Sequence, residues 1–371
     1  MARHRRLLGT VALMAASALV ATGCSGSGSS GGSKAAGGSA TGDRPLKIAL
    51  SNSYIGNQWR IEMVNIFRAA CAMPPYQGKV DCPIYNSGND VSKQSQHITN
   101  LISQKVDAIV LDAASGTGLN GVVKQACDRG IVVVAFDNVP TEPCAVQVSV
   151  DQGAIGTLMA QYLVDKLGGK GNVIMVTGVA GAPADTARND AAEVVFKQHP
   201  DIKIVAKYAG DWDSATAQRN TATQLPSLPK VDGVWVSAGT DGVIKAFQDA
   251  KRPLPYFTGE SENGFRKFLL GTSGAKVHGV STGTPPFLAV LALEYARALV
   301  TKQRQAKNLL IPLPKVTDED VVEGETVFKD QPDSFYASFT DSGPKATVKL
   351  CIDAALVGTP CDGSLTVNLP A

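Results

Sequence analysis

The chain has 371 residues, with 35 basic and 33 acidic side chains, a formal net charge of +2 and 44% hydrophobic residues. This length and apolar content allow more than one domain, each with its own core. No cluster of lysines and arginines occurs beyond the first six residues. The composition therefore argues against a nucleic acid as partner.

The N-terminus has the pattern of an export signal. Three arginines among the first six residues precede an apolar run over residues 7–21, which is too short to span a membrane. The letters ATGC at 21–24 resemble the bacterial lipobox, in which the cysteine is lipidated and becomes the new N-terminus. We therefore predict a lipoprotein signal peptide over residues 1–23 and lipidation of Cys24. An ordinary cleaved signal is the alternative.

Residues 24–43 are predicted to be a tether, because they are rich in glycine and serine and contain no large apolar side chain beyond Cys24. A flexible chain of this length reaches about 25 Å. It would link the anchored cysteine to a domain that begins near Arg44, on the outer face of the cell membrane or in the periplasm. Removal of residues 1–23 takes away three arginines and leaves 32 basic against 33 acidic side chains.

Six cysteines follow Cys24, and an even number favours disulfides in an exported chain. They form three close groups along the sequence. No CxxC motif and no close pair of histidines is present, so we expect neither a metal site nor redox chemistry. We predict the local bridges Cys71–Cys82, Cys127–Cys144 and Cys351–Cys361.

Strand and helix patterns alternate from residue 46 onward. The apolar strands, without polar alternation, are typical of a parallel sheet that is covered on both faces. In chain order we predict a strand at 46–50, a helix from Trp59 to Ala70, a strand at 84–85, a helix at 91–104, a strand at 108–111, a helix at 119–129 and a strand at 131–136.

The alternation restarts after residue 152. We predict helices at 155–167, 186–198, 214–224, 242–250 and 287–301, and strands at 173–176, 202–206, 233–236, 256–257 and 277–280. These elements are too many for one sheet of ordinary width, so the sequence predicts two α/β lobes. Residues 317–371 do not show this alternation of strand and helix patterns, so we expect an irregular C-terminal segment.

The turn after the first strand, residues 51–60, reads SNSYIGNQWR. It carries two aromatic rings, amide groups and a guanidinium group where a simple connection would use small turn residues. Loops at the carboxyl ends of strands bind ligands in open α/β sheets. We therefore interpret this turn as part of a binding site.

Two short stretches match enzyme motifs but lack their context. Residues 116–121 read GTGLNG, the spacing of a dinucleotide-binding loop, but four residues separate them from the preceding strand. Residues 279–283 read GVSTG, the spacing of a nucleophile elbow, but two prolines delay the next helix and no histidine follows His278. We therefore predict a protein that is not an enzyme and uses no cofactor.

A lipoprotein signal, a tether and two α/β lobes together resemble the solute-binding lipoproteins of bacterial ABC importers. Residues 90–109, DVSKQSQHITNLISQKVDAI, are similar to a helix and strand of the ribose-binding-protein-like group, which has the type I periplasmic-binding-protein fold. The resemblance covers residues 46–316. It implies two similar three-layer lobes with parallel sheets joined by a hinge: an N-terminal lobe (44–149 and 283–312), a C-terminal lobe (150–282 and 313–330), an irregular tail (331–371) and hinge segments near 148–152, 281–284 and 311–315.

The resemblance also implies a ligand site, because ligand-binding side chains of the family follow successive strands of both lobes. Relatives often carry Asp-Arg where this chain has Asp137-Asn138, a departure that bears on the identity of the ligand. The residues that match the family's ligand positions are Tyr54, Asn57, Gln58, Trp59, Arg60, Asp137, Asn138, Arg188, Trp212, Thr240, Asp241 and Glu260.

The mapped side chains suit a sugar. The aromatic faces of residues such as Trp59 and Trp212 can cover the apolar C–H faces of a sugar. Carboxylates and guanidinium groups, which are planar, can form hydrogen bonds with its hydroxyl groups. Acids and bases occur together, which favours a neutral ligand over a phosphate or carboxylate. We predict a monomeric, lipid-anchored receptor that binds a neutral monosaccharide or sugar alcohol and delivers it to an ABC permease with a separate ATPase subunit. A sensory receptor for a sugar or autoinducer-like signal, feeding a membrane kinase or chemoreceptor, is the alternative.

Overall fold

The structure is a computed structural model, and it describes residues 44–337, 347–349, 351–363 and 365–370. The predicted signal peptide, the tether and the lipidation site at Cys24 lie outside the described residues. Among the helices described, none combines the length and the hydropathy that crossing a bilayer requires.

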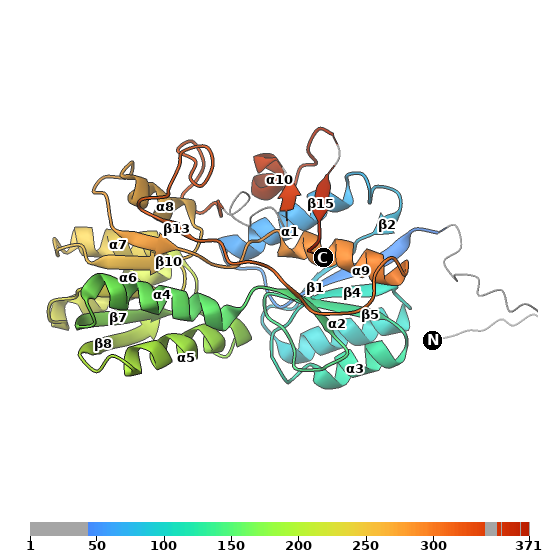
Figure 1. Cartoon of the computed structure of the whole chain (residues 1–371). Helices are drawn as coiled ribbons and strands as arrows, with labels where there is room; N and C mark the ends of the chain where they lie inside the picture. Colours follow the sequence, from blue (N-terminus) through green and yellow to red (C-terminus); the bar gives the residue numbers. More distant parts are fainter. Residues whose placement is uncertain (1–43, 338–346, 350, 364, 371) are drawn as a thin grey trace, which may run out of the picture. The chain divides into compact units, whose positions relative to one another are not determined.

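The first lobe is built on a parallel sheet with the strand order β12-β6-β5-β4-β1-β2, in which β3 also pairs with β1 (Figure 1). Its strands are β1 (Leu46–Asn52), β2 (Val80–Asp81), β3 (Ile84–Asn86), β4 (Ala108–Asp112), β5 (Val132–Phe136), β6 (Val146–Ser149) and β12 (Leu309–Leu310). Its helices are α1 (Gln58–Cys71), α2 (Val91–Ser103), α3 (Asn120–Asp128) and α9 (Leu288–Val300).

Helices cover both faces of this sheet, which explains why its strands are apolar throughout. Side chains of α2 and α3, such as Leu101 and Val122, pack on one face with Ile109 of β4. Helices α1 and α9 pack on the other face. Helix α9 has no polar residue before Glu294, and its side chains from Leu288 to Leu293 are fully buried.

The second lobe is built on a sheet with the strand order β13-β11-β10-β9-β7-β8, in which only β13 runs antiparallel to its neighbour. Its strands are β7 (Gly171–Thr177), β8 (Ile202–Ala209), β9 (Gly233–Val236), β10 (Tyr256–Gly259), β11 (Gly279–Ser281) and β13 (Val316–Thr317). Its helices are α4 (Gln152–Leu167), α5 (Pro183–Lys197), α6 (Ser214–Gln224), the 3-10 helix η1 (Leu225–Ser227), α7 (Thr240–Asp249) and α8 (Asn263–Leu270).

The chain passes three times between the two sheets. It leaves the first sheet after β6 through residues 150–151, returns after β11 through residues 282–287 to enter α9, and leaves again after β12 through residues 311–315. Each lobe is therefore assembled from segments that are far apart in the sequence. That these three connections act as a hinge stays a prediction.

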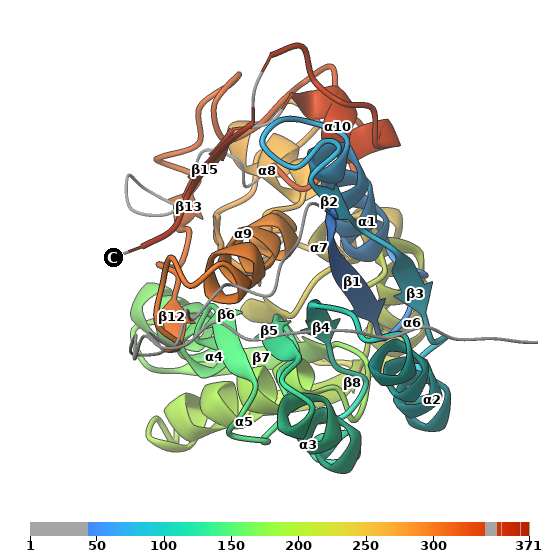
Figure 2. The same ribbon diagram turned by 90° about the vertical axis from the view of Figure 1, so that its right-hand side faces the viewer.

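The C-terminal tail is more regular than the lost alternation suggested. It contains helix α10 (Ile352–Val357) and an antiparallel pair of strands, β14 (Thr347–Lys349) and β15 (Thr366–Asn368). Helix α10 lies against α1 of the first lobe in both views (Figures 1 and 2), and the side-chain amide of Asn65 donates hydrogen bonds to the carbonyls of Ala355 and Leu356. These elements are too short to show a periodic pattern in the sequence, and they pack on the first lobe through contacts of α10 with α1 and of β15 with α9.

The structure contains the three predicted disulfides. They join Cys71 at the end of α1 to Cys82, Cys127 in α3 to Cys144, and Cys351 at the start of α10 to Cys361. Each bridge closes a loop of 10 to 17 residues at the end of an element. The last bridge stabilises the tail that packs on α1.

Helices α4 and α5 approach closely at Gly156. A Cβ atom at this position would lie 2.1 Å from the backbone oxygen of Arg188, which cannot move without shifting α5. We expect Gly156→Ala to lower the free energy of unfolding by about 2–3 kcal/mol, because the helices must separate. Urea unfolding of the purified protein measures the change.

Gly121 in α3 offers the matched control. A Cβ atom there meets nothing within 4 Å, so Gly121→Ala should leave stability unchanged or raise it by up to about 1 kcal/mol through helix propensity. Equal effects of the two substitutions would contradict the close packing of α4 on α5.

Candidate functional site

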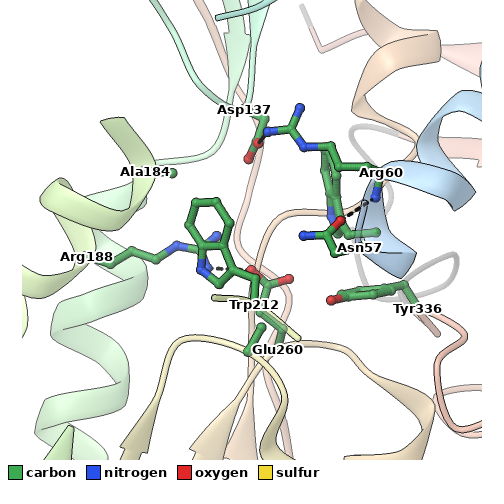
Figure 3. Close-up of a pocket in the computed structure, with 10 residues that line it drawn as sticks. Asn57, Arg60, Asp137, Ala184, Arg188, Trp212, Glu260 and Tyr336 are labelled. Carbon is green, nitrogen blue, oxygen red and sulfur yellow. Dashed lines mark hydrogen bonds and ion pairs between the residues drawn. The ribbon is translucent and has the colours of Figure 1, made fainter. Parts of the chain in front are cut away.

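A cavity lies between the two lobes, where the carboxyl ends of the parallel strands of both sheets face each other (Figure 3). About 320 Å³ of space among its lining residues is not filled by protein atoms, the open solvent at its mouth included. The residues that line it are Asn57, Trp59, Arg60 and Asp137 from the first lobe, Ala184, Arg188, Trp212, Ala238 and Glu260 from the second lobe, and Tyr336 from the segment after β13.

The first lobe contributes a buried guanidinium group. Helix α1 begins at the carboxyl end of β1, because the side chain of Asn57 caps it by accepting a hydrogen bond from the backbone N–H of Arg60. The guanidinium carbon of Arg60 lies 5.0 Å from the ring centre of Tyr54 and 5.1 Å from that of Trp59. The two rings hold the cation between them by cation–π attraction.

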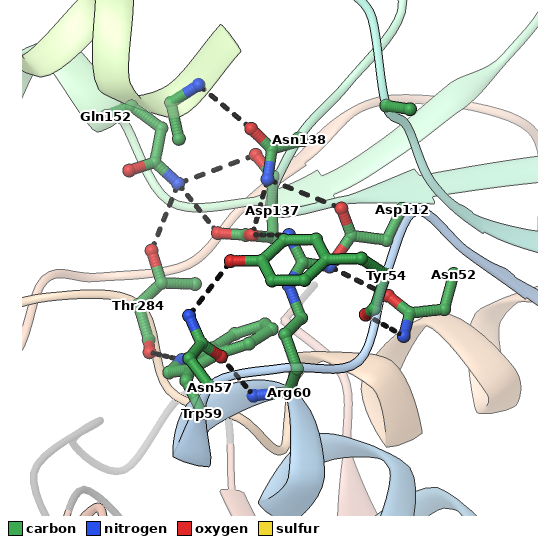
Figure 4. A network of polar contacts seen from close by, with 12 residues as sticks. Asn52, Tyr54, Asn57, Trp59, Arg60, Asp112, Asp137, Asn138, Gln152 and Thr284 are labelled. Atoms are coloured by element: carbon green, nitrogen blue, oxygen red, sulfur yellow. Dashed lines mark hydrogen bonds and ion pairs between the residues drawn. The ribbon is translucent and has the colours of Figure 1, made fainter. Parts of the chain in front are cut away.

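Two carboxylates neutralise Arg60 (Figure 4). Asp112 at the end of β4 forms an ion pair with Nη1, and Asp137 after β5 lies 3.3 Å from Nη2. Arg60 and Asp112 are both almost fully buried, where an unpaired charge would cost several kcal/mol. The side-chain amide of Asn138 also donates to Asp137, at 2.8 Å.

The second lobe contributes a second buried ion pair. Arg188 of α5 donates a hydrogen bond of 2.5 Å to Oε1 of Glu260, which follows β10. Burial is the main cause that raises the pKa of Glu260 to about 7, and the nearby Asp137 adds to it, while Arg188 opposes it. The other oxygen, Oε2, has no hydrogen bond of normal geometry to the described residues. Glu260 can therefore offer a ligand either a lone pair or, when protonated, a hydroxyl donor.

Two residues join the two ion pairs: Gln152, the first residue of α4, and Thr284, in the connection between β11 and α9. Gln152 donates to Oδ1 of Asp137 at 3.2 Å and accepts from Nε of Arg188 at 2.8 Å. The Oγ1 atom of Thr284 accepts from Gln152 and from Nη2 of Arg188, and its carbonyl accepts from the indole of Trp59 at 2.6 Å. The polar network is therefore continuous from one lobe to the other.

Trp212 forms an aromatic wall of the second lobe. It follows β8 in a left-handed conformation, with φ of 56°, and its indole nitrogen donates to the hydroxyl of Ser237 at 2.8 Å. A Cβ atom at Gly178 would lie 2.0 Å from that nitrogen. Only glycine at position 178 lets the indole take this place beside the cavity.

Seven of the residues predicted from the sequence line the cavity, and two more support it. Tyr54 packs on Arg60 and accepts a hydrogen bond from Asn57, while Asn138 accepts one from the backbone N–H of Ala184, across the lobes. The seven lining residues are Asn57, Trp59, Arg60, Asp137, Arg188, Trp212 and Glu260.

Three predicted residues lie outside the cavity. Gln58 is exposed in the first turn of α1. The hydroxyl of Thr240 donates to the carbonyl of Thr258, and Asp241 forms an ion pair with Lys245. Glu262 caps the start of α7, where its side chain accepts from the backbone N–H groups of residues 239 and 240.

Sequence reasoning also missed residues of the site. Asp112 is the last residue of a buried strand, and Gln152 is the first residue of α4. Thr284 belongs to the connection between β11 and α9, and Tyr336 lies in the tail. Asp112 had a usable signal, because a carboxylate at the carboxyl end of a central parallel strand faces the ligand edge. Gln152, Thr284 and Tyr336 had no signal in the sequence that would have predicted their place in the site.

A family model for the periplasmic binding protein domain matches residues 48–304. The chain belongs to the periplasmic binding protein family. A xylitol-binding protein of Mycolicibacterium smegmatis (strain ATCC 700084 / mc(2)155) is 30% identical over 251 residues, which cover 64% of this chain and 69% of the relative. The ribose import binding protein RbsB of Bacillus subtilis (strain 168) is 24% identical, over 64% of this chain and 77% of the relative.

A solved structure supports the same fold for this periplasmic binding protein. The crystal structure of an ABC transporter solute binding protein from Thermobispora bispora DSM 43833 superposes with a TM-score of 0.68 at 29% identity, covering 84% of this chain and 93% of that chain. The fold is the type I architecture of two lobes with parallel sheets, as the sequence predicts.

The raised pKa of Glu260 predicts a pH dependence of stability. The carboxyl group titrates at about 7 in the folded protein, against an ordinary value of 4.5. The folded state therefore binds more protons between these values, and the free energy of unfolding falls as the pH rises through this window. Between pH 5 and pH 7.5, we expect the free energy of unfolding of Glu260→Gln to fall by about 2 kcal/mol less than that of the wild type.

Urea unfolding at the two pH values measures this difference. Burial, the nearby Asp241 and the charge of Glu260 raise the pKa of Glu262 to about 8, so Glu262 titrates with the same sign. Because Glu260→Gln removes one of these causes, it lowers the pKa of Glu262 and changes the pH slope further in the same direction. An identical pH slope in the wild type and Glu260→Gln would show that Glu260 titrates normally.

Proposed function

We propose that this periplasmic binding protein is the solute receptor of an ABC importer and that the cavity between its lobes holds one neutral monosaccharide or sugar alcohol. The observation that carries this proposal is the pairing of the charges in the cavity. Arg60 lies against Asp112 and Asp137, and Arg188 lies against Glu260. A site built this way has no free cation for an anionic ligand and no isolated carboxylate for a cation.

The walls of the cavity match the two surfaces of a sugar. The rings of Trp59 and Trp212 supply flat apolar faces for C–H groups. Asp137, Arg188 and Glu260 supply acceptors and donors for hydroxyl groups. A relative named as a xylitol-binding protein, at 30% identity, is consistent with this class of ligand.

The proposed mechanism is closure of the lobes on the ligand. The ligand would meet Asp137 of one lobe and Arg188 of the other, which Gln152 already joins through hydrogen bonds. The three connections at residues 150–151, 282–287 and 311–315 would act as the hinge. The closed receptor would then deliver the ligand to a permease whose ATPase is a separate chain. The relatives do not favour the sensory alternative, since one of them is named for import.

The N-terminus supports export and anchoring of the receptor. The signal pattern over residues 1–23 and the Gly/Ser-rich tether suit a lipid anchor at Cys24 that leaves the lobes free to reach a permease. The mass of the mature N-terminal peptide tests this assignment. That the protein is monomeric and is not an enzyme also remains a prediction.

Two substitutions test the proposed site, after a thermal-shift screen of pentoses, hexoses and polyols, xylitol included, has identified the tightest ligand. Asp137→Asn and Arg188→Met should each weaken binding by about 2–4 kcal/mol, because the first replaces a charged acceptor of a ligand hydroxyl by a neutral amide and the second removes the donors of the guanidinium group. Isothermal titration calorimetry measures the affinity, and thermal unfolding of the ligand-free protein shows whether the fold is retained.

The control is Asp128→Ala, which removes an exposed carboxylate paired with Lys124 on α3. It should leave the affinity unchanged. Wild-type affinity in both Asp137→Asn and Arg188→Met would show that the ligand binds elsewhere. Failure of every uncharged sugar and polyol to stabilise the wild type would reject the ligand class.

A further inference from the structure

A short segment of the tail, residues 333–337, brings Tyr336 to the cavity wall although it lies beyond residues 48–304, which match the family domain. It runs along the start of α8. The backbone N–H of Asn263 donates to the carbonyl of Phe335 at 2.7 Å, and that of Ala337 donates to the carbonyl of Ser261 at 2.8 Å. Tyr336 and Glu262 form an antiparallel bridge between these bonds. The segment is therefore held firmly to the second lobe, next to Glu260.

The same segment also contacts the first lobe. The backbone N–H of Tyr336 donates a hydrogen bond of 2.8 Å to Oε2 of Glu62, a buried residue of α1. Glu62 belongs to the helix that carries Trp59 and Arg60 into the cavity. The position of Tyr336 is therefore fixed by both lobes, as expected for a side chain that meets a ligand between them.

The side chain of Tyr336 is available to a ligand. Figure 3 shows its hydroxyl end directed toward the cavity and toward Glu260. The hydroxyl makes no hydrogen bond to the described residues, although the residue as a whole is only 3% exposed. Burial raises the pKa of the phenol, and the carboxyl groups of Glu262 and Glu260 raise it further, so the hydroxyl stays protonated and can donate.

We propose that Tyr336 is a ligand-contacting residue that determines specificity, supplied to the site by the C-terminal extension. This inference rests on the proposed function. The ring adds a third aromatic face beside Trp59 and Trp212, and the hydroxyl recognises one hydroxyl group of the bound sugar or polyol. A ligand that lacks that hydroxyl leaves the phenol without a partner in the closed cavity and binds more weakly.

The experiment compares the wild type with Tyr336→Phe and Tyr336→Ala, each purified as the full chain. Calorimetry measures how tightly each protein binds the tightest ligand of the sugar and polyol panel and the deoxy analogues of that ligand. Tyr336→Phe keeps the ring and every backbone bond of the segment. It should weaken binding of the parent ligand at least 10-fold, and one deoxy analogue should bind the wild type and Tyr336→Phe equally. Tyr336→Ala should weaken binding of the parent ligand further, at least 50-fold.

Tyr208→Phe is the matched control, because it removes a tyrosine hydroxyl that bonds to Thr221 within the second lobe, away from the cavity. It should change the affinity less than 2-fold. Affinities within 2-fold of the wild type in both Tyr336 variants would overturn the proposal while leaving the proposed function intact. A wild-type protein that binds no member of the panel would reject the proposed function and, with it, the role of Tyr336.

Discussion

Two arginines are buried where the lobes meet, and much of the site follows from the need to neutralise them. An isolated guanidinium group in such a position would cost several kcal/mol. Arg60 is therefore held by two rings and two carboxylates, and Arg188 by Glu260. These acids stand at or just after the carboxyl ends of parallel strands, so the sheets must bring those ends together. Within each sheet the parallel strands place their carboxyl ends at one edge, and the cavity lies between these two edges.

This neutralisation links the shape of the protein to its proposed selectivity. Gln152 and Thr284 lie at the connections between the lobes, and both contact Arg188. The proposed movement of the lobes would therefore alter the same hydrogen bonds that would hold a ligand. A neutral polyol can insert its hydroxyls into this network without changing its charge, whereas an anion would compete with Asp137 and Glu260 for their partners.

The sequence predicted the parts of the molecule that depend on local pattern. Apolar strands alternating with helices predicted two parallel α/β lobes, and the family resemblance implied that Asp137 belongs to the ligand site. Helix α8 was not predicted, because its eight residues are too few to show a clear helical pattern. Thr240 and Asp241 do not line the cavity, and nothing in the sequence shows that they bond to Thr258 and Lys245 instead. Tyr336 was missed because a long-range pairing with Glu262 brings it there.

Calorimetry with a matched set of ligands tests the central claim most directly. The set consists of the tightest uncharged sugar or polyol, the acid made by oxidising its terminal carbon, and its phosphate ester, each titrated into the purified protein at pH 7.5. Because the charges of the cavity are already paired, the uncharged ligand should bind at least 100-fold more tightly than either anion, a difference of about 3 kcal/mol. Equal or tighter binding of the acid or the phosphate ester would contradict the account.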